Sequence, residues 1–329
     1  MNQQEFEKEW KNDSDFVVCH TSGSTGVPKE IPLKKDFMRQ SAKRSNDFFH
    51  INSESRLHTC LDFQYIASKM MTVRADVANC LLTSEAASNR PLKDISTDES
   101  ISLLSVVPSQ MIWILDNVRN LPEIRNVLIG GSPIPPMLRC RISLSGINAW
   151  ESYGMTETAS HIALRKVTDD ENEPFKTLEG IAVEVNGEGC LVIDMPGVER
   201  LATNDLAEVV SPTEFRILGR ADNCIISGGV KIIPEMLEGA LGSFIAFAYC
   251  ISSVPDPKWG ERLVLIVEKG ESELSDEIIK KAVGVRLEQF KKSLALGPKA
   301  PKEIFLIDHI PLNANGKIDR KTLKLLQKC

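Results

Sequence analysis

The segment TSGSTGVPKE, residues 21–30, combines hydroxyl side chains, two glycines and a lysine in one short stretch. Glycines let backbone N–H groups converge on a phosphate, hydroxyls add further donors, and Lys29 adds a positive charge. The segment is not a Walker A loop, because Pro28 stands where that pattern needs its second glycine. It predicts a polyphosphate-binding loop, with an ordinary polar surface loop as the alternative.

A second group of reactive side chains lies in ESYGMTET, residues 151–158. The ring of Tyr153 can stack on a base, the hydroxyls of Thr156 and Thr158 can reach a phosphate, and the carboxylate of Glu157 can hold Mg²⁺ among phosphate oxygens. A strand end followed by a helix that Thr156 caps fits the same residues. The segment therefore indicates a nucleotide site without establishing one.

Three charged residues further along the chain suit the remaining parts of a nucleotide. Asp205 can accept hydrogen bonds from the vicinal hydroxyls of a ribose. Arg220 can donate to the same sugar or to a phosphate. Lys317 follows an Asn-Gly turn, which projects a side chain from a short, rigid loop. Each of them is also compatible with an unremarkable position on the surface.

The elements that must position these residues are predicted by short apolar runs. The runs at 101–107, 126–129 and 147–150 are rich in β-formers and alternate with longer mixed segments, a pattern typical of an α/β fold with a largely parallel sheet. From about residue 181, IAVEV, CLVI, AEVV and FRIL predict short strands of an antiparallel, β-rich subdomain, the first two joined by the turn NGEG.

The last hundred residues predict a small α+β domain. LVLIV (263–267) and EIFLI (303–307) are expected to be strands, and Ser275 is expected to cap a helix. The apolar face of that helix comprises Ile279, Val283, Leu287, Phe290 and Leu294. A basic helix ends the chain. We expect a domain over 1–221, β-rich at about 178–220, and a second domain over 222–329.

Composition limits the class of protein. The 329 residues are 42% hydrophobic and 26% charged, with a net charge of −6 that gives no general reason to bind nucleic acid. No run approaches the roughly 20 apolar residues that cross a bilayer, and the polar start of the chain is unlike a signal peptide, so a cytoplasmic location is expected. The 8 cysteines are scattered, which indicates buried free thiols rather than a zinc site or a disulfide framework.

Taken in order, TSGSTGVPKE, ESYGMTET and the segments around Asp205, Arg220 and Lys317 resemble the five signature motifs of the adenylate-forming superfamily. This superfamily comprises acyl-CoA synthetases, adenylation domains of peptide synthetases, and luciferase. The resemblance extends from Thr21 to Lys317, nearly the whole chain. It implies a large α/β domain with a β-rich subdomain and a small, mobile α+β domain. It also implies an acid–thiol ligase that uses ATP, Mg²⁺ and coenzyme A and acts through an acyl-adenylate.

The resemblance implies roles in ATP binding for the motif residues. The loop that closes over the β- and γ-phosphates comprises Thr21, Ser22, Gly23, Ser24, Thr25, Gly26 and Lys29. The residues expected along adenine are Gly130, Gly131 and Ser132 of GGSPIPP, with Tyr153, Gly154 and Met155. Thr156 is expected to meet the α-phosphate and Glu157 to hold Mg²⁺, while Asp205 and Arg220 grip the ribose.

The resemblance also implies how the second domain acts. Lys317 is expected to bridge the substrate carboxylate and the α-phosphate during adenylation. The small domain is then expected to swing about Asp222, withdrawing Lys317. Gly228 and Gly229 would move in to line the pantetheine channel, where small residues allow close approach.

The acid is indicated by LDFQYIASKMMTVRA, residues 61–75, where Tyr65 stands at the position of a family histidine. Lys69 and Arg74 follow, and cations there suit a substrate with a second carboxylate. This segment and YGMTETASHIALR are most similar to the o-succinylbenzoate–CoA ligases of menaquinone biosynthesis. We hypothesise that Arg74, Lys69 or His161 faces the second carboxylate; the alternative is that Arg74 and Lys69 are solvated helix residues.

Two departures from the family pattern affect these expectations. Asn204 replaces a glycine, and asparagine tolerates left-handed backbone better than most residues. Only 20 residues precede Thr21, so we expect the usual N-terminal subdomain to be absent and the acyl pocket to be open or completed by a second chain, as in a homodimer.

Three other functions fit the motifs. They are another aryl or short-chain acyl-CoA synthetase, an acyl-AMP ligase that loads a carrier protein, and an inactive nucleotide-binding homologue. Intact Lys317, Glu157 and Asp205 argue against the last of these.

Overall fold

The computed structural model describes residues 1–20, 29–93, 95–242, 244–270, 273–294, 300–312 and 318–326. The predicted phosphate loop at 21–26 and the predicted catalytic Lys317 lie outside these ranges. Contacts divide the chain into a first unit (Met1–Glu184, Ile193–Leu201 and Val209–Arg216) and a second unit (Val185–Val192, Ala202–Glu208 and Ile217–Cys329).

The centre of the first unit is a parallel sheet in the order β9-β8-β6-β3-β4. Its strands are β3 (Arg56–Thr59), β4 (Leu81–Ser84), β6 (Leu103–Val106), β8 (Val127–Ile129) and β9 (Ala149–Met155). The prediction of a parallel sheet is therefore confirmed. Strands β5 (Ser100–Ile101) and β7 (Glu123–Ile124) form a separate two-stranded parallel sheet.

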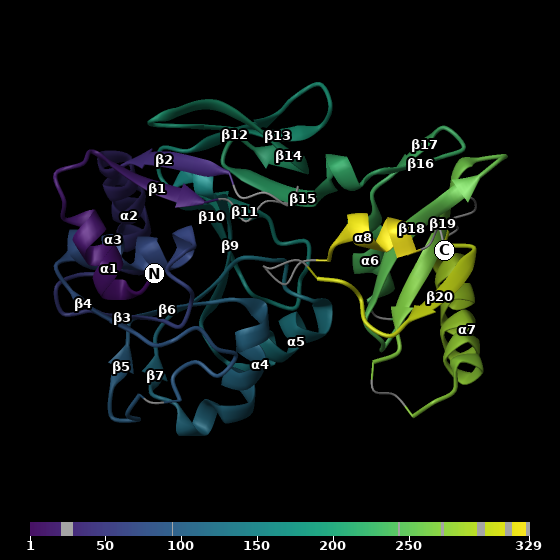
Figure 1. Cartoon of the computed structure of the whole chain (residues 1–329), viewed down its shortest axis with the longest axis horizontal. Helices are drawn as coiled ribbons and strands as arrows, with labels where there is room; N and C mark the ends of the chain where they lie inside the picture. Colours follow the sequence, from purple (N-terminus) through teal and green to yellow (C-terminus); the bar gives the residue numbers. More distant parts are fainter. Residues whose placement is uncertain are drawn as a thin grey trace. The chain divides into compact units, whose positions relative to one another are not determined.

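The connecting helices lie on opposite faces of this sheet. The chain leaves β3 through α3 (Ile66–Ala78) to β4 on one side, then continues from β6 through α4 (Pro108–Asn117) to β8 and through α5 (Pro136–Ser145) to β9 on the other. Because such crossovers are right-handed, the reversal of direction places α3 on one face and α4 and α5 on the other, as Figure 1 shows. Ligands of open α/β sheets bind beyond the carboxyl ends of the strands where the order reverses, here β3 and β6.

The sheet is fixed by a dense apolar core. Buried side chains from the strands meet those of α4 and α5, among them Leu104, Val127, Ile129, Met111 and Ile142. Strands buried on both faces read as continuous apolar runs, which is why these runs could be recognised in the sequence.

Two helices and a hairpin precede this sheet. Helix α1 (Gln3–Trp10) is capped by Asn2, whose Oδ1 accepts from the backbone of Glu5 at 3.0 Å, and it buries Phe6 and Trp10. Strands β1 (Phe16–His20) and β2 (Glu30–Lys34) pair antiparallel as a separate two-stranded sheet. Helix α2 (Lys35–Phe49) follows and packs against α3.

Beyond β9 the sheet becomes antiparallel through β10 (Ser160–Lys166), β11 (Phe175–Thr177) and β15 (Glu214–Arg220). It continues in the order β15-β14-β13-β12, with β12 (Ala182–Val185), β13 (Cys190–Met195) and β14 (Val198–Ser211). The expectation that AEVV is a short strand is wrong, because it belongs to the 14-residue β14. The predicted NGEG turn is present, since Asn186 Oδ1 accepts from the backbone of Glu188 and Cys190, each at 2.9 Å.

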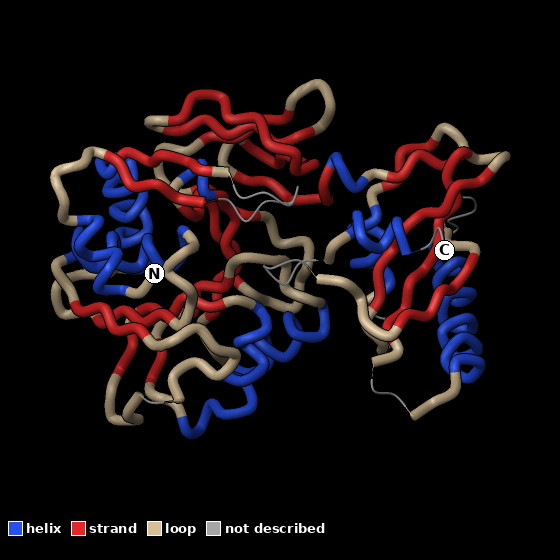
Figure 2. Tube along the Cα trace, viewed as in Figure 1, coloured by secondary structure: helices blue, strands red, loops and turns tan. Residues whose placement is uncertain are grey.

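The second unit is a compact α+β arrangement (Figure 2). Strand β19 (Gly260–Glu268) pairs antiparallel with β18 (Tyr249–Asp256) and parallel with β20 (Glu303–Ile307), and the hairpin of β16 (Ile225–Ser227) and β17 (Val230–Ile232) joins β19 at Ser227. The helices are α6 (Pro234–Leu241), α7 (Asp276–Leu294) and α8 (Arg320–Leu326).

Helix α7 forms as its sequence predicts. The Ser275 hydroxyl accepts from the backbone of Ile278 at 3.4 Å. The predicted apolar face is buried at Ile279, Val283, Leu287 and Phe290. Together with the mixed sheet of the first unit, this confirms the predicted fold class.

Within the residues described above, no helix is long and apolar enough to cross a membrane. The cysteines in those ranges are free, and Cys19, Cys60, Cys190 and Cys250 are buried.

Candidate functional site

The YGMTE motif forms the end of β9 and the tight turn that follows it. The turn spans Thr156–Thr158, and β10 then returns antiparallel to β9. The hydroxyl of Thr158 accepts from the backbone of Met155 at 3.0 Å and is 2.7 Å from the carbonyl oxygen of Ser160. The suggestion that Thr158 reaches a phosphate is therefore wrong, because its buried hydroxyl closes the turn; Thr156 and Glu157 remain as candidates.

Gly154 permits the close approach of β9 and β10. A Cβ atom at this position would lie 2.2 Å from the carbonyl oxygen of Ser160 and 2.5 Å from the Cα of His161. These are backbone atoms, so no side-chain rotation could relieve the clash. The glycine at the centre of the motif is thus a packing requirement as well as part of the expected adenine site.

The ring of Tyr153 is held by other aromatic rings. Its centroid lies 5.2 Å from that of Phe215 in an edge-to-face arrangement and 5.9 Å from that of Phe175, and these two buried rings stack on each other at 5.7 Å. Arg165 lies 4.5 Å from the centre of the Phe175 ring. A ring with so many neighbours is pre-oriented, which suits a residue that stacks on a base.

A buried ion cluster lies two residues before Tyr153. The Glu151 carboxylate accepts from Arg165 Nε at 2.8 Å and from Arg139 Nη2 of α5, and both Glu151 and Arg139 are almost completely buried. Sequence reasoning missed this cluster, because nothing local in ESYGMTET pairs Glu151 with an arginine of α5. The pairing connects the strand of the YGMTE motif to the helix that follows the GGS loop.

The GGS loop lies next to the same strand. Gly130 follows β8 and donates its N–H to the carbonyl of Val106 at 3.0 Å, and a Cβ on it would lie 2.7 Å from the Ser152 hydroxyl. Gly131 has φ +87°, a conformation that favours glycine. The structure therefore brings the GGS loop of Gly130, Gly131 and Ser132 next to the YGMTE strand, and both segments are expected at adenine.

The cations of the 61–75 segment are buried. Lys69 and Arg74 on α3 are 2% and 1% exposed, so the alternative that they are solvated helix residues is wrong. Lys69 Nζ donates to the carbonyl of Val18 at 3.0 Å and lies 5.4 Å from the Phe6 ring centre. Tyr65, at the N-terminus of α3, is 37% exposed.

The Arg74 guanidinium lies among neutral groups. It donates from Nε to the Ser45 hydroxyl at 2.9 Å and from Nη2 to the Ser160 hydroxyl and His161 Nδ1, both at 3.2 Å. Burial lowers the pKa of Arg74 to about 10, so it stays charged at neutral pH. Burial and the Arg74 charge lower the pKa of His161 well below its usual value. Across the described ranges, no carboxylate forms an ion pair with Arg74.

In the second unit the predicted ribose pair and the predicted hinge residue meet. Arg220 Nη1 donates to Asp205 at 3.1 Å, and Arg220 Nε and Nη2 donate to Asp222 at 2.9 and 3.0 Å. The hydrogen bonds to Asp222 raise the pKa of Arg220 against the effect of burial. Burial opposes ionisation of Asp222, but the Arg220 guanidinium outweighs it and lowers the pKa of this carboxyl.

The two glycines expected at the pantetheine channel adopt left-handed conformations, with φ +57° at Gly228 and +78° at Gly229. The N–H of Gly228 donates to the carbonyl of Trp259 at 2.8 Å, and a Cβ on Gly228 would lie 2.7 Å from the Trp259 ring. Lys258 and Lys302 lie 4.7 and 5.3 Å from the centre of that ring. Sequence reasoning missed Trp259. Its signal in the sequence was a large aromatic residue next to a glycine in DPKWG, residues 256–260.

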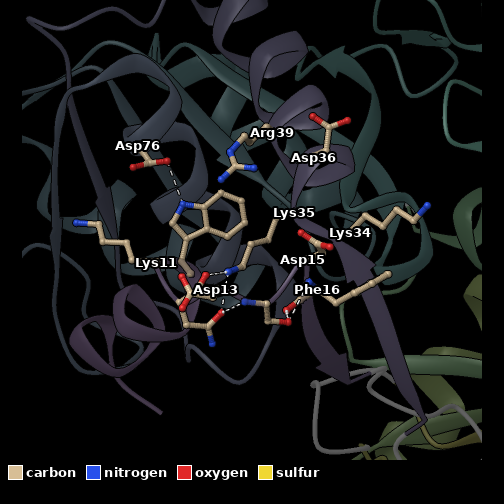
Figure 3. A pocket seen from close by; sticks show the side chains of 12 residues that line it. Lys11, Asp13, Asp15, Phe16, Lys34, Lys35, Asp36, Arg39 and Asp76 are labelled. Atoms are coloured by element: carbon tan, nitrogen blue, oxygen red, sulfur yellow. Dashed lines mark hydrogen bonds between the residues drawn. The ribbon is translucent and has the colours of Figure 1, made fainter.

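A separate cavity of about 660 Å³ lies in the first unit (Figure 3). Its lining comes from the end of α1, the segment before β1, and the start of α2. Trp10 Nε1 donates to Asp76 at 3.0 Å, and Lys35 Nζ donates to the carbonyl of Asn12 at 2.7 Å. Of the residues predicted to bind ATP or the acid, none that the structure describes lines this cavity.

The parallel sheet, the glycine loop after β8 and the Tyr–Gly–x–Thr–Glu turn after β9 define an adenylate-forming type of enzyme. A model of the AMP-binding enzyme family matches residues 2–209, and the chain belongs to this family.

Similar proteins agree with this membership. The 2-succinylbenzoate–CoA ligase of Lactococcus lactis is 24% identical over 330 residues, which cover 94% of this chain and 70% of that protein. The crystal structure of an acyl-CoA synthetase (AMP-forming)/AMP-acid ligase II-like protein from Dyadobacter fermentans is 29% identical, with a TM-score of 0.61 over 99% of this chain and 93% of that one. The o-succinylbenzoate CoA synthetase of Bacillus subtilis, in complex with its acyl-adenylate intermediate, shares the fold with a TM-score of 0.77 at 23% identity, over 93% of this chain and 68% of that one.

Proposed function

We propose that this protein is an ATP-dependent carboxylate–CoA ligase that converts o-succinylbenzoate, ATP and coenzyme A to o-succinylbenzoyl-CoA, AMP and pyrophosphate. Membership of the AMP-binding enzyme family supports the use of ATP. The similarity to 2-succinylbenzoate–CoA ligases over 94% or more of this chain supports the choice of thiol and acid. The observation that carries the choice of acid is the burial of Arg74 without a carboxylate partner among the described residues.

In the first half of the proposed reaction, the substrate carboxylate attacks the α-phosphorus of ATP, the bond to the β-phosphate oxygen breaks, and pyrophosphate leaves. Negative charge builds on the α-phosphoryl oxygens, so Thr156 and Lys317 act most strongly at this stage. Gly130 and Gly131 lie beside the strand of the YGMTE motif, because a Cβ on Gly130 would lie 2.7 Å from the Ser152 hydroxyl, and this neighbourhood supports the assignment of both segments to adenine. Glu157 supplies a hard carboxylate oxygen for Mg²⁺, which typically binds one or two carboxylates together with substrate phosphates.

In the second half, the thiol of coenzyme A attacks the carbonyl carbon of the acyl-adenylate, and AMP leaves. We assign Asp222 as the hinge for the rearrangement between the halves, which makes 1–221 and 222–329 the moving parts. Its ion pair with Arg220 supports this role, because Arg220 also holds Asp205, the expected ribose ligand. The open space at Gly229, where a Cβ would meet nothing within 4 Å, suits close approach of the pantetheine arm, while Gly228 packs against Trp259.

The charge of Arg74 supports an acid with two carboxylates. A guanidinium that is 1% exposed has lost its hydration, and hydroxyls, a sulfur atom and an imidazole cannot neutralise it. Buried charges are usually paired, so an anionic group is missing from this environment. The segment that carries Arg74 begins after β3, at the carboxyl edge where the strand order reverses and ligands of such sheets bind. The aromatic carboxylate of o-succinylbenzoate would supply the missing charge while its succinyl carboxylate reacts.

The test is a CoA thioester assay with o-succinylbenzoate beside benzoate, succinate and a fatty acid. We expect ATP-dependent thioester only, or by far fastest, with o-succinylbenzoate. We also expect the KM for this acid to rise at least tenfold in Arg74→Ala, with the exposed Arg119→Ala as a matched control. Thioester formation with another acid of the panel but not with o-succinylbenzoate would refute the substrate, and an unchanged KM in Arg74→Ala would remove Arg74 from the site.

We further propose that the protein acts in the cytoplasm, where ATP and coenzyme A are available, in the synthesis of menaquinone, and that it is a homodimer. The outward side chains of β1 support a second chain there, because Phe16 and Val18 are 43% and 42% exposed on one face of the hairpin. Light scattering is expected to give twice the chain mass, and the mass of a single chain in Phe16→Ser. A monomeric wild-type protein would contradict the dimer.

A further inference from the structure

Three basic side chains are candidates for contacting the second carboxylate, and they differ in the hydrogen-bonding atoms that remain open. Lys69 donates to the carbonyl of Val18 in β1 and lies against the ring of Phe6 in α1. Its ammonium is therefore committed to the junction between the N-terminal hairpin and α3. A ligand would have to break this arrangement in order to use it.

Arg74 is also largely committed. Its Nε donates to Ser45, and its Nη2 donates to Ser160 and to His161 Nδ1. Its Nη1 lies 3.5 Å from the sulfur of Met71, a weak acceptor. The guanidinium thus supplies positive charge from within the protein while its donors are directed at neighbouring side chains.

The contact with Arg74 fixes the protonation of His161. A guanidinium can only donate, so His161 Nδ1 must accept, and the ring proton lies on Nε2. Burial and the adjacent Arg74 charge lower the pKa of His161 well below its usual value, which keeps the ring neutral in this tautomer. Nε2 is buried and has no hydrogen-bond partner among the residues that the structure describes.

The position of this open donor is next to the nucleotide motif. His161 is 5% exposed and lies opposite Gly154 in the register of β9 and β10. A buried N–H without an acceptor destabilises a folded protein, and a bound substrate can provide the acceptor. The nearby uncompensated charge of Arg74 favours an anionic acceptor over a neutral one.

We propose that His161 is a specificity-determining residue whose Nε2–H donates to the second carboxylate of the acid, and that Arg74 is the positioning residue that holds the imidazole in the donating tautomer. The proposal rests on the proposed function and deepens it. It assigns the direct contact to His161 and the supporting charge to Arg74.

The test compares o-succinylbenzoate with 4-oxo-4-phenylbutanoate, which has the same succinyl arm and ring but lacks the ring carboxylate. The enzymes are the wild-type chain of 329 residues, His161→Phe, which has no donor, and His161→Gln, whose amide places a donor close to the position of Nε2. We expect the ratio of kcat/KM for the two acids to fall about tenfold or more in His161→Phe and to stay within about threefold of wild type in His161→Gln. The KM for ATP is expected to be unchanged in both variants.

The outcomes separate this proposal from the proposed function. If wild type forms no thioester with o-succinylbenzoate, the proposed function is refuted. If wild type forms it and the ratio is unchanged in His161→Phe, only the role of His161 is refuted. A loss in His161→Gln equal to that in His161→Phe would also contradict a role as donor.

A spectroscopic measurement keeps the proposal testable even if His161→Phe fails to fold. The chain contains 5 histidines, and ¹⁵N labelling of histidine with His161→Gln as the reference identifies the signals of His161. We expect the pattern of a neutral ring protonated on Nε2, and a shift of the Nε2 signal on addition of o-succinylbenzoate but not of the monoacid. A proton on Nδ1, or no response to o-succinylbenzoate in a protein that turns it over, would overturn the proposal.

Discussion

Neutralising Glu151 provides a quantitative test of the cluster behind the nucleotide motif. The Glu151 carboxylate lies between Arg139 and Arg165, and the side chains of Glu151 and Arg139 are 6% and 3% exposed. In Glu151→Gln the shape is kept, but the guanidinium groups of Arg139 and Arg165 lose their counter-charge in a largely buried region. Removing one partner of a buried ion pair costs about 3–5 kcal/mol. Because the glutamine oxygen retains a hydrogen bond, we expect a loss of about 2–4 kcal/mol of unfolding free energy.

The same helix supplies a matched control. Arg141 lies two residues after Arg139 on α5 and pairs with Asp116 at 2.7 Å, but these two side chains are 46% and 56% exposed. Water and salt screen such a pair, so Asp116→Asn is expected to cost no more than about 1 kcal/mol. Both pairs join an arginine of α5 to a carboxylate, and the comparison therefore isolates the effect of burial.

The assay is urea denaturation followed by circular dichroism, supported by thermal melting. The expected loss corresponds to a decrease of roughly 5–15 °C in the melting temperature for Glu151→Gln. In a double variant, replacing Arg139 with Met as well is expected to recover part of the loss, because it removes one of the unpaired charges. The reasoning is wrong if Glu151→Gln costs no more than Asp116→Asn.

Three further predictions concern the two half-reactions and pH. Lys317→Ala is expected to reduce ATP–pyrophosphate exchange about 10²–10³-fold while leaving thioester formation from supplied acyl-adenylate, and undiminished exchange would contradict its role. Gly228→Ala is expected to slow CoA-dependent thioester formation but not pyrophosphate exchange, because its Cβ would lie 2.7 Å from Trp259 in a left-handed conformation; equal rates in variant and wild type would contradict this. Below about pH 6.5 the unfolded chain binds a proton at His161 that the folded chain excludes, because the pKa of His161 is lowered in the folded protein. As the pH decreases from 6.5 toward 5, the unfolding free energy of wild type is therefore expected to decrease by about 1.4 kcal/mol per pH unit relative to that of His161→Gln. A difference between the two proteins that stays constant from pH 7 to 5 would contradict a lowered pKa at His161.

Local sequence patterns predicted the elements whose signals are complete within a few residues. The run from Ser275 to Phe290 contains its own cap and its own apolar stripe, and α7 follows it. The parallel strands could be recognised as continuous apolar runs because both of their faces are buried. Helix α1 was not predicted, because its two buried side chains, Phe6 and Trp10, pack on a surface that residues later in the chain form.

The length of β14 shows where such patterns end. Its residues 198–211 include Glu, Arg, Asn and Asp, which are uncommon in strands, and only AEVV gave a β signal. Pairing with neighbouring strands extends the element across ATND, since strand preference depends strongly on tertiary context. Asp205 is consequently held within a strand and can meet Arg220, which a loop position would not guarantee.

The acyl segment separates what a sequence can specify from what requires coordinates. The letters of LDFQYIASKMMTVRA place two cations after a strand, and the resemblance to a family gives them a reason to be there. They do not indicate that both cations are buried, or that Lys69 is directed toward Val18. The direction of each donor depends on a carbonyl of β1 and on side chains of α2 and β10, which are far apart in sequence. Only their joint placement leaves Arg74 without a counter-ion and His161 Nε2 without an acceptor among the described residues, and a dicarboxylic acid would satisfy both.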